Sequence, residues 1–285
     1  DIMSHLFDRK DVDVAWCPGC GNFGILKLVK EVLEELEVEK KNCVIVSGIG
    51  QAAKTPYYVD TNMFGVLHGR ALPVATGIKL SNENLHVIAE GGDGDMYGEG
   101  GNHFIHTIRR DVNIVNIVHN NMVYGLTKGQ ASPTSQRGFV TGVQVGGVIN
   151  EPFNPLAVAL SLKAGFVARV NIGNIKHAKE VLKEAFLHKG YALVDILQPC
   201  VTFNKINTYD WFSENSYVLD DSYDASDFEQ AVKKSYETIP MPIGVLYKNK
   251  NSRVSFEEAI RGRHAKPLHT LTHDISKIQS LFESY

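Results

Sequence analysis

Two stretches of the sequence end in residues that could bind a metal ion and a phosphate. Residues 87–95 (VIAEGGDGD) and 116–121 (NIVHNN) each begin as an apolar run of strand length and stop in glycines or polar side chains. Carboxyl ends of buried parallel strands meet at one edge of a sheet, so these ends should lie side by side. Asp93, Asn121 and a nearby backbone carbonyl would give half of an octahedral shell, which Mg²⁺ usually completes with phosphates. We therefore expect a Mg²⁺–diphosphate site.

The segments around these two ends should position them. Residues 97–110 carry apolar side chains at helical spacing, which predicts a strand–helix–strand unit. Gly92 and Gly94 lack a Cβ and would let the backbone approach a ligand closely. The alternative is that both ends are ordinary turns with satisfied polar side chains. Other helices are expected over 22–38, 71–80, 154–164, 175–188 and 228–236, and other strands from residue 43 and over 166–170, 191–197 and 244–247.

Cys17 and Cys20 form a Cys-x-x-Cys pair immediately before the first predicted helix. A helix N-terminus stabilises a thiolate, so the pair could be a thioredoxin-like dithiol. It could equally supply two ligands to an iron–sulfur or zinc site, or be an inert buried pair. The sequence has no second Cys-x-x-Cys, which argues against a zinc ribbon with four cysteines.

A second glycine motif matches a dinucleotide-binding fingerprint only formally. Gly48, Gly50 and Ala53 follow a predicted strand with the fingerprint's spacing. Pro56, however, stands where the phosphate-binding helix should extend, and no acidic residue ends a second strand at the expected distance. We therefore discount dinucleotide binding.

Composition narrows the class of protein. The formal net charge of −3 is nearly balanced and no basic cluster is present, which argues against a nucleic-acid partner. Residues 1–13 lack the apolar core of a signal peptide, and no stretch is long and apolar enough to span a bilayer. We expect a cytoplasmic protein without a membrane partner, in which the four cysteines serve metal or redox chemistry rather than disulfides.

Several motifs together resemble one family. Gly-Asp-Gly followed by Asn-Asn is the signature of thiamine diphosphate enzymes. The longer set is similar to the β subunit of the 2-oxoacid:ferredoxin oxidoreductases, in particular the 2-oxoglutarate and broad 2-oxoacid group. It runs from about Ala15 to Tyr209 and comprises WCPGCG (16–21), HGR (68–70), GDGD (92–95), GLTKGQASPTS (125–135) and LQPC (197–200).

The resemblance implies a fold and a domain organisation. The expected fold is α/β, with a doubly wound and mostly parallel sheet of the pyrophosphate-domain type that binds thiamine diphosphate. Residues 1–204 would form this domain together with the Cys-x-x-Cys segment. Residues 205–285, rich in aromatic residues at first and polar later, would be a C-terminal extension that wraps a partner subunit.

The resemblance also implies site residues. Mg²⁺ would be held by Asp93, Asn121 and the backbone carbonyl of Val123. His68 would meet a phosphate or the aminopyrimidine ring, unless it is a structural hydrogen-bonding residue. The expected cofactor-binding residues are Gly48, Ile49, Gly50, His68, Gly92, Asp93, Gly94, Asp95, Asn121, Val123, Tyr124, Gly125, Leu126 and Thr127.

The segment 122–147 is long, rich in glycine and without clear periodicity, so we interpret it as the active-site loop. Lys128 is the only cation of this loop that we expect close to the site. A 2-oxo acid carries a carboxylate, which Lys128 could orient, or it could bind a second, distal carboxylate. The alternative is a solvated surface lysine.

The cysteines are expected to hold a [4Fe–4S] cluster, with one departure from the family pattern. Cys17, Cys20 and Cys200 would supply three thiolates at the carboxyl edge of the sheet. Gln51 stands where the family commonly has a fourth cysteine, and Cys43 lies at the opposite end of the same predicted strand. The fourth ligand is left open, because a cluster normally takes four ligands.

The activity implied is oxidative decarboxylation. A 2-oxo acid such as 2-oxoglutarate or pyruvate and coenzyme A would give acyl-CoA and CO₂, with electrons passed to ferredoxin. The chain has no room for the pyrimidine-binding domain, so an α subunit must supply it in an αβ or (αβ)₂ heteromer, with γ and δ subunits as an option. The alternative is a non-catalytic electron-transfer or scaffold subunit with a cluster. A synthase of the acetolactate type is disfavoured by the missing fused domain and the Cys17/Cys20 pair.

Overall fold

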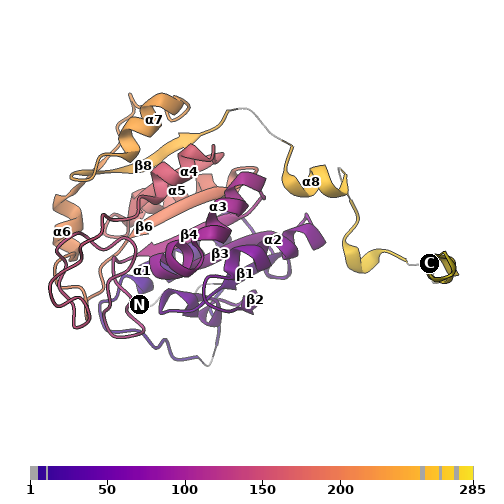
Figure 1. The fold of residues 1–285 in the computed structure, drawn as a ribbon, viewed down its shortest axis with the longest axis horizontal. Coiled ribbons are helices and arrows are strands. Elements are labelled where there is room, and N and C mark those ends of the chain that lie inside the picture. The colour runs from indigo at the N-terminus through magenta and orange to yellow at the C-terminus, as the bar shows by residue number, and fades with distance from the viewer. Residues whose placement is uncertain (1–5, 11, 251–253, 263–264, 273–275, 285) are drawn as a thin grey trace.

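One mixed sheet of eight strands forms the centre of the protein (Figure 1). The computed structural model describes residues 6–10, 12–250, 254–262, 265–272 and 276–284. The expectation that residues 1–13 are not a signal peptide concerns residues 1–5 and 11 as well, and these lie outside the described residues. The strand order is β2-β1-β3-β4-β6-β5-β8-β7. The strands are β1 (Cys43–Ser47), β2 (Asn62–Gly65), β3 (His86–Gly92), β4 (Val115–Asn120), β5 (Phe166–Asn171), β6 (Ala192–Leu197), β7 (Ser216–Val218) and β8 (Met241–Lys248).

Strands β1 to β6 run parallel, and this confirms the expected mostly parallel α/β sheet. Strands β1, β4, β5 and β6 are buried along their whole length because helices cover both faces of the sheet, whereas the edge strand β2 is mostly exposed. Ser47 on β1 pairs with Glu90 on β3, and Gly92 on β3 pairs with His119 on β4. This register brings the carboxyl ends of β1, β3 and β4 to one edge of the sheet, as the motif spacing predicts.

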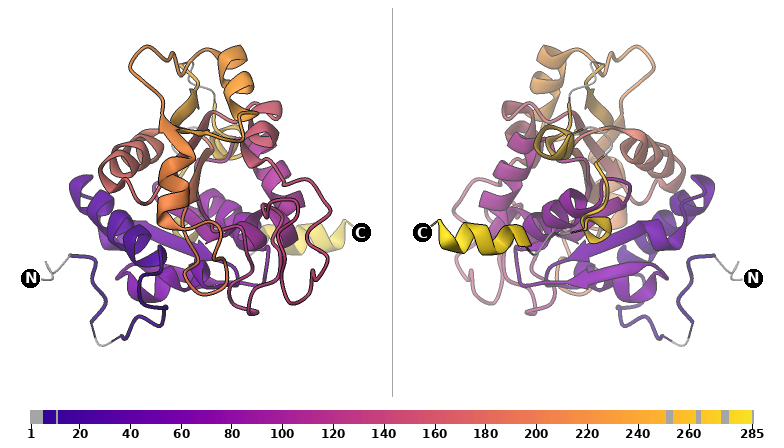
Figure 2. Two further views of the ribbon diagram at one scale, coloured as in Figure 1. Left: turned by 90° about the vertical axis from the view of Figure 1, so that its left-hand side faces the viewer. Right: turned by 90° about the vertical axis from the view of Figure 1, so that its right-hand side faces the viewer.

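Two helical layers enclose the sheet, as Figure 2 shows. Helices α1 (Asn22–Glu35) and α5 (Ile175–Leu187) share one apolar core with one face. Helices α2 (Ala71–Ser81), α3 (Gly101–Arg110), α4 (Pro155–Ser161) and α7 (Phe228–Ser235) share a second core with the other face. The remaining helical segments are η1 (Lys40–Asn42), η2 (Ala52–Tyr58), η3 (Gly94–Glu99), α6 (Tyr209–Glu214), α8 (Phe256–Arg261), η4 (Leu268–Thr270) and α9 (Ser276–Glu283).

Two elements differ from the sequence-based expectation. The helix expected over 97–110 is divided: η3 is a π-helix, and α3 begins at Gly101. The strand expected over 244–247 is longer and joins the sheet as β8, antiparallel to β5, with β7 at the edge beside it. The sheet thus includes residues on both sides of residue 204.

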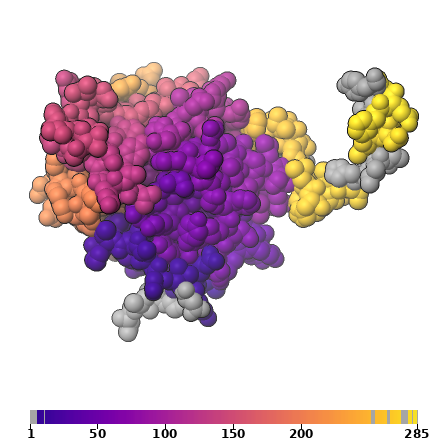
Figure 3. All heavy atoms as spheres, turned by 60° about the horizontal axis from the view of Figure 1, so that its bottom comes forward, coloured from indigo at the N-terminus to yellow at the C-terminus, as the bar shows by residue number. Residues whose placement is uncertain are grey.

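The end of the chain leaves this body. Helix α8 contacts α2, and Arg261 donates a hydrogen bond to the backbone oxygen of Leu80. Beyond α8, the segment with η4 and α9 extends away from the sheet, as the yellow atoms in Figure 3 show. Ile278 and Phe282 of α9 are exposed. No helix among the described residues is long and apolar enough to cross a membrane.

Candidate functional site

A cavity opens at the carboxyl edge of β1, β3 and β4, and we call it the cofactor cavity. It is lined by Ile49, Gly50, Gln51, Ala52, His68, Gly92, Asp93, Gly94, Asp95, Asn121, Val123, Tyr124, Gly125, Leu126 and Thr127. Thirteen of the fourteen residues expected to bind the cofactor therefore lie around one space. The structure brings them together from four separate segments of the chain; their roles stay predictions.

Asp93, directly after β3, is a buried carboxylate of this cavity. Its carboxylate Oδ2 accepts hydrogen bonds from the hydroxyls of Ser132 and Thr134, each at 2.5 Å. Both donors belong to the long loop after β4, so the loop folds back over the strand end. Burial raises the pKa of Asp93 to about 6, although the two hydroxyls act in the opposite direction. A cation in this cavity would compensate the buried charge.

A buried polar chain continues from Thr134 beneath the cavity. The Thr134 hydroxyl lies 2.8 Å from Oδ1 of Asn120, the last residue of β4. The Asn120 amide donates to the Asp195 carboxylate at 3.1 Å, and Asp195 also accepts from Tyr97 OH and from Arg169 Nε. With its NH₂ group bound to Asp195, the Asn120 amide must turn its oxygen toward Thr134. This series of buried hydrogen bonds therefore fixes the hydroxyl that contacts Asp93.

Asp95 connects three strand ends at the cavity wall. Its Oδ1 accepts from the backbone N–H of Ile49 at 3.1 Å and of Gly69 at 2.8 Å, and lies 2.6 Å from Nδ1 of His68. Gly48 does not line the cavity; instead a Cβ there would lie 2.2 Å from the Asp95 carboxylate. Asp95 thus acts as a cross-link, and Gly48 leaves it the necessary space.

The conformation around Asp95 also explains why the predicted helix starts late. The Gly100 N–H donates to the Asp95 backbone oxygen at 2.9 Å, the long hydrogen bond of a π-helical turn. This turn directs both Asp93 and Asp95 to the sheet edge before α3 begins. Single π-turns of this kind are frequent at functional sites.

His68 and Tyr124 form part of the opening of the cavity. His68 Nε2 lies 3.6 Å from the Glu99 carboxylate, which also accepts a hydrogen bond from Tyr124 OH at 3.0 Å. Burial and the negative charge of Glu99 raise the pKa of Tyr124 well above its ordinary value. The phenol therefore stays protonated and acts as a hydrogen-bond donor.

Lys128 lies in a tight turn between Tyr124 and Gln130, which form a short antiparallel bridge. Its backbone φ is +76°, and its side chain is exposed. Leu126 and Thr127, just before it, line the cofactor cavity, whereas Lys128 itself does not. Lys128 is therefore next in sequence to the cavity lining, and its role in binding a substrate stays a prediction.

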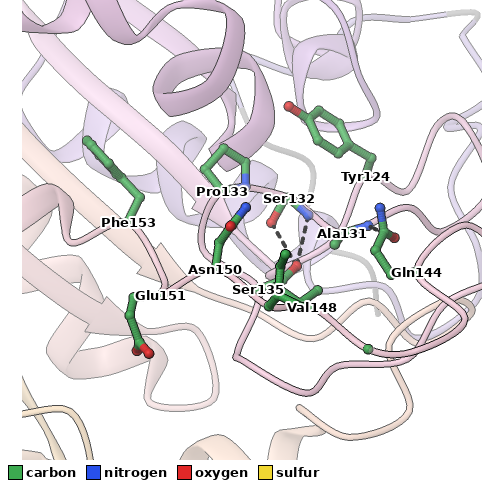
Figure 4. A pocket seen from close by; sticks show the side chains of 12 residues that line it. Tyr124, Ala131, Ser132, Pro133, Ser135, Gln144, Val148, Asn150, Glu151 and Phe153 are labelled. Atoms are coloured by element: carbon green, nitrogen blue, oxygen red, sulfur yellow. Dashed lines mark hydrogen bonds between the residues drawn. The ribbon is translucent and has the colours of Figure 1, made fainter.

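The loop after β4 encloses a second space of about 660 Å³, which we call the loop cavity (Figure 4). Ser132, Ser135, Gln144 and Val148 are among the residues that line it, and Tyr124 lines both this space and the cofactor cavity. Ser135 donates to the backbone oxygen of Met122, and its hydroxyl accepts from the Ser132 N–H. Although it has little regular structure, the loop is held in place by polar contacts.

A third space lies next to the cofactor cavity, and we call it the cysteine cavity. It is lined by Trp16, Cys17, Cys20, Asn22, Gln51, Asn121, Gly125, Cys200, Val201, Thr202 and Phe203. The structure therefore brings together Cys17, Cys20 and Cys200, the three cysteines that the sequence predicts as cluster ligands. Burial raises the pKa of Cys20, although the backbone N–H of Asn22 acts in the opposite direction.

Two further observations concern the cysteines. Cys43 is buried at the start of β1, the strand end opposite to the cavity, and burial raises its pKa to about 12. Among the residues that the structure describes, no group of three or more histidine, cysteine, aspartate or glutamate side chains is placed to hold a metal ion. Cysteine ligation therefore stays a prediction.

Sequence reasoning did not identify the side chains that support Asp93. Ser132 and Thr134 belong to the quoted loop motif, but nothing in their spacing shows that they contact a residue about forty positions earlier. Asn120 is the last residue of the buried strand β4, and Asp195 lies within the buried strand β6. A charged residue in an otherwise apolar strand indicates a buried polar network, and Asp195 could have been recognised in this way.

Comparison with known proteins agrees with this geometry. Residues 44–196 match the sequence model of the thiamine pyrophosphate enzyme C-terminal TPP-binding domain, and residues 200–265 match that of the C-terminal part of the pyruvate ferredoxin oxidoreductase beta subunit. The chain is 47% identical to a 2-oxoacid:ferredoxin oxidoreductase subunit beta of Sulfolobus over 86% of this chain and 85% of that protein. It is 46% identical to the 2-oxoglutarate oxidoreductase subunit KorB of Mycobacterium tuberculosis over 68% and 52%, respectively.

A solved structure shows the same fold. It is the 2-oxoglutarate:ferredoxin oxidoreductase from Magnetococcus marinus with 2-oxoglutarate, coenzyme A and succinyl-CoA bound. The TM-score is 0.89 at 36% sequence identity, and the similarity covers 96% of this chain and 94% of that chain. The chain belongs to the beta subunits of the 2-oxoacid:ferredoxin oxidoreductases.

Proposed function

We propose that this chain is the thiamine diphosphate-binding subunit of an enzyme that oxidatively decarboxylates a 2-oxo acid with coenzyme A and passes the electrons to ferredoxin. The observation that carries the proposal is the cofactor cavity, where the ends of three parallel strands bring Asp93, Asn121 and the Gly-Asp-Gly turn together. The family relationship and the ligands named for the Magnetococcus enzyme support the choice of reaction.

The donor set fits Mg²⁺ and a diphosphate. Asp93, Asn121 and Val123 line the same cavity and offer a carboxylate, an amide oxygen and a backbone carbonyl, all hard oxygen ligands. Ser132 and Thr134 contact Oδ2 of Asp93, which directs the carboxylate. When bound, thiamine diphosphate supplies the carbon nucleophile and electron sink that decarboxylation requires.

The remaining residues would position the ligands. His68, whose Nδ1 contacts Asp95, would meet a phosphate or the aminopyrimidine ring. Leu126 and Thr127 cover one side of the cavity. Lys128 would bind the substrate's carboxylate end from the turn that follows, and a distal carboxylate would make 2-oxoglutarate the preferred acid.

A partner subunit would complete the site. The described residues form one sheet with its covering helices, and an α subunit would supply the pyrimidine-binding domain in an αβ or (αβ)₂ assembly. Exposed apolar side chains near β2 and the cavity, such as Ile49, Phe64 and Leu67, are suited to being covered by another protein. The segment with η4 and α9 would wrap such a subunit. Ferredoxin as acceptor, further subunits and a cytoplasmic location remain predictions.

Cys17, Cys20 and Cys200 would hold an iron–sulfur cluster. The cysteine cavity shares Gln51, Asn121 and Gly125 with the cofactor cavity, so a cluster there would lie next to the thiamine site. Soft thiolates are the natural ligands of iron–sulfur clusters, so three cysteines around one space suit such a cluster.

The proposal is tested by cofactor retention. The complex with its partner subunit should bind thiamine diphosphate in a Mg²⁺-dependent manner, and Asp93→Ala should abolish this binding while thermal unfolding remains cooperative. Asp221→Ala removes an exposed carboxylate elsewhere and should bind like the wild type. If the wild-type complex takes up iron but no thiamine diphosphate, the chain is instead an electron-transfer or scaffold subunit.

A further inference from the structure

We infer that the side-chain oxygen of Gln51 is the non-thiolate ligand of the cluster whose other three corners are Cys17, Cys20 and Cys200. The inference rests on the proposed function for the presence of a cluster. It adds a specific fourth ligand and a consequence: the iron at this corner exchanges more readily than the other three. It also places that corner on the side of the cofactor cavity.

The backbone holds Gln51 next to the cysteines. The indole N–H of Trp16 donates to the backbone oxygen of Gln51 at 2.8 Å, and Trp16 directly precedes Cys17. The ring of Trp16 in turn packs edge-on against Phe23 and Tyr58. The end of β1 and the Cys-x-x-Cys turn are thus joined by one partly buried hydrogen bond, so Gln51 keeps its place relative to Cys17.

The other two thiols belong to the same fixed arrangement. The Cys20 N–H donates to the Cys17 backbone oxygen at 3.0 Å, in a turn where Gly19 has a φ of +78°. The Thr202 hydroxyl donates to the Cys17 sulfur at 3.1 Å and so connects the turn that carries Cys200. The three sulfurs and Gln51 therefore surround the cavity from three separate segments.

Among the polar side chains of this cavity, Gln51 is the one with an oxygen left over. The Asn22 oxygen lies 2.9 Å from Nδ1 of buried His119, and Thr202 bonds to Cys17. Asn121 accepts from the Val123 N–H and belongs to the expected Mg²⁺ site. Oε1 of Gln51, in contrast, is buried and has no hydrogen-bond partner. A buried acceptor without a partner is costly unless a ligand satisfies it.

The donor chemistry determines how the four corners differ. Iron in a cluster prefers thiolate sulfur, and an amide oxygen is a harder and weaker ligand. Gln51 also lines the cofactor cavity, so the weakly held iron would face the thiamine site rather than the solvent. Three thiolates retain a three-iron core after that iron is lost.

The test uses the full complex, reconstituted anaerobically with iron and sulfide. Mild oxidation with ferricyanide removes one electron from the four-iron cluster in its 2+ state. The cluster then releases one Fe²⁺ and becomes a three-iron cluster in its 1+ state, which has its own EPR signal. Wild type is compared with Gln51→Cys, with Gln51→Ala and with Gln136→Cys, which adds a cysteine outside the cavity.

We expect wild type to lose one iron per cluster and to gain the three-iron signal. Gln51→Cys should keep four irons under the same oxidation, because every corner then has a thiolate. Gln51→Ala should contain three irons before any oxidation, and Gln136→Cys should behave like wild type. Cooperative thermal unfolding, measured on each preparation, shows whether each variant is folded.

Three results would overturn the inference. The first is a wild-type cluster that keeps four irons as firmly as Gln51→Cys does. The second is Gln51→Ala with the same iron content and EPR spectrum as wild type. The third is a wild-type complex that binds thiamine diphosphate but no iron, which would remove the cluster and leave the thiamine function intact. A wild-type complex that binds no thiamine diphosphate would instead count against the proposed function.

Discussion

Replacing Thr134 by valine tests whether the loop after β4 organises Asp93, the proposed metal ligand. Valine keeps the volume and removes one hydroxyl, which lies 2.5 Å from the Asp93 carboxylate and 2.8 Å from Oδ1 of Asn120. Thr134, Asp93 and Asn120 are 4%, 2% and 1% exposed, so water cannot replace the lost donor. We therefore expect measurable losses in both stability and Mg²⁺-dependent cofactor binding.

The magnitudes follow from the geometry. One hydroxyl proton serves one acceptor at a time, so a single hydrogen bond to a charged group is lost, at about 1.5–3 kcal/mol of folding free energy. Removing a group that orients a metal ligand typically lowers metal affinity by about 10- to 100-fold. Thr134→Val should thus bind Mg²⁺–thiamine diphosphate about 10- to 100-fold more weakly.

The assay pairs calorimetric titration of thiamine diphosphate at fixed Mg²⁺ with urea unfolding of the complex. Thr134→Ser restores the hydroxyl and should recover most of the affinity. If Thr134→Val binds the cofactor within about twofold of wild type and unfolds at the same urea concentration, the hydroxyl does not support Asp93. A loss of stability with unchanged affinity would assign Thr134 a structural role only.

Three further predictions concern other parts of the molecule. Lys128→Ala should raise the KM for 2-oxoglutarate far more than for pyruvate. An equal rise for both acids would mean that Lys128 binds the carboxylate they share, and an unchanged KM for both would mean that Lys128 is a solvated surface residue. Gly48→Ala puts a Cβ 2.2 Å from the Asp95 carboxylate and should cost about 1–3 kcal/mol by urea unfolding, whereas Gly77→Ala, with nothing within 4 Å, should not destabilise. Burial lowers the pKa of His188 below 6.5, so folding stability is complete above that pH and falls as pH drops through 6.5 toward the folded-state pKa. His188→Gln should flatten this fall in Tm, and an unchanged pH profile would contradict it.

The sequence predicted the cofactor cavity because its residues stand at strand ends. Asp93 and Asn121 each follow a recognisable apolar strand, and parallel strands bring such ends to one edge whatever the details of packing. The cysteines were predictable for the same reason, since Cys200 follows β6 and the Cys-x-x-Cys turn precedes α1.

Other features depend on contacts that no local pattern encodes. Ser132 and Thr134 reach Asp93 across a loop without periodicity, so only the fold shows which hydroxyls meet the carboxylate. The π-turn at Gly94–Glu99 interrupts a segment whose helical spacing is intact, because Asp95 is held by the ends of neighbouring strands. Strand β8 pairs antiparallel with β5 across more than seventy residues, a pairing that composition does not reveal.

The central claim is that this chain provides the thiamine diphosphate site of a 2-oxoacid oxidoreductase but not a complete active site. The most direct measurement is reduction of a viologen dye driven by a 2-oxo acid in the presence of coenzyme A, thiamine diphosphate and Mg²⁺. The complex with the pyrimidine-domain subunit should reduce the dye, and both Asp93→Ala in the complex and this chain alone should not. Dye reduction by this chain alone, or full activity of the Asp93→Ala complex, would contradict the account.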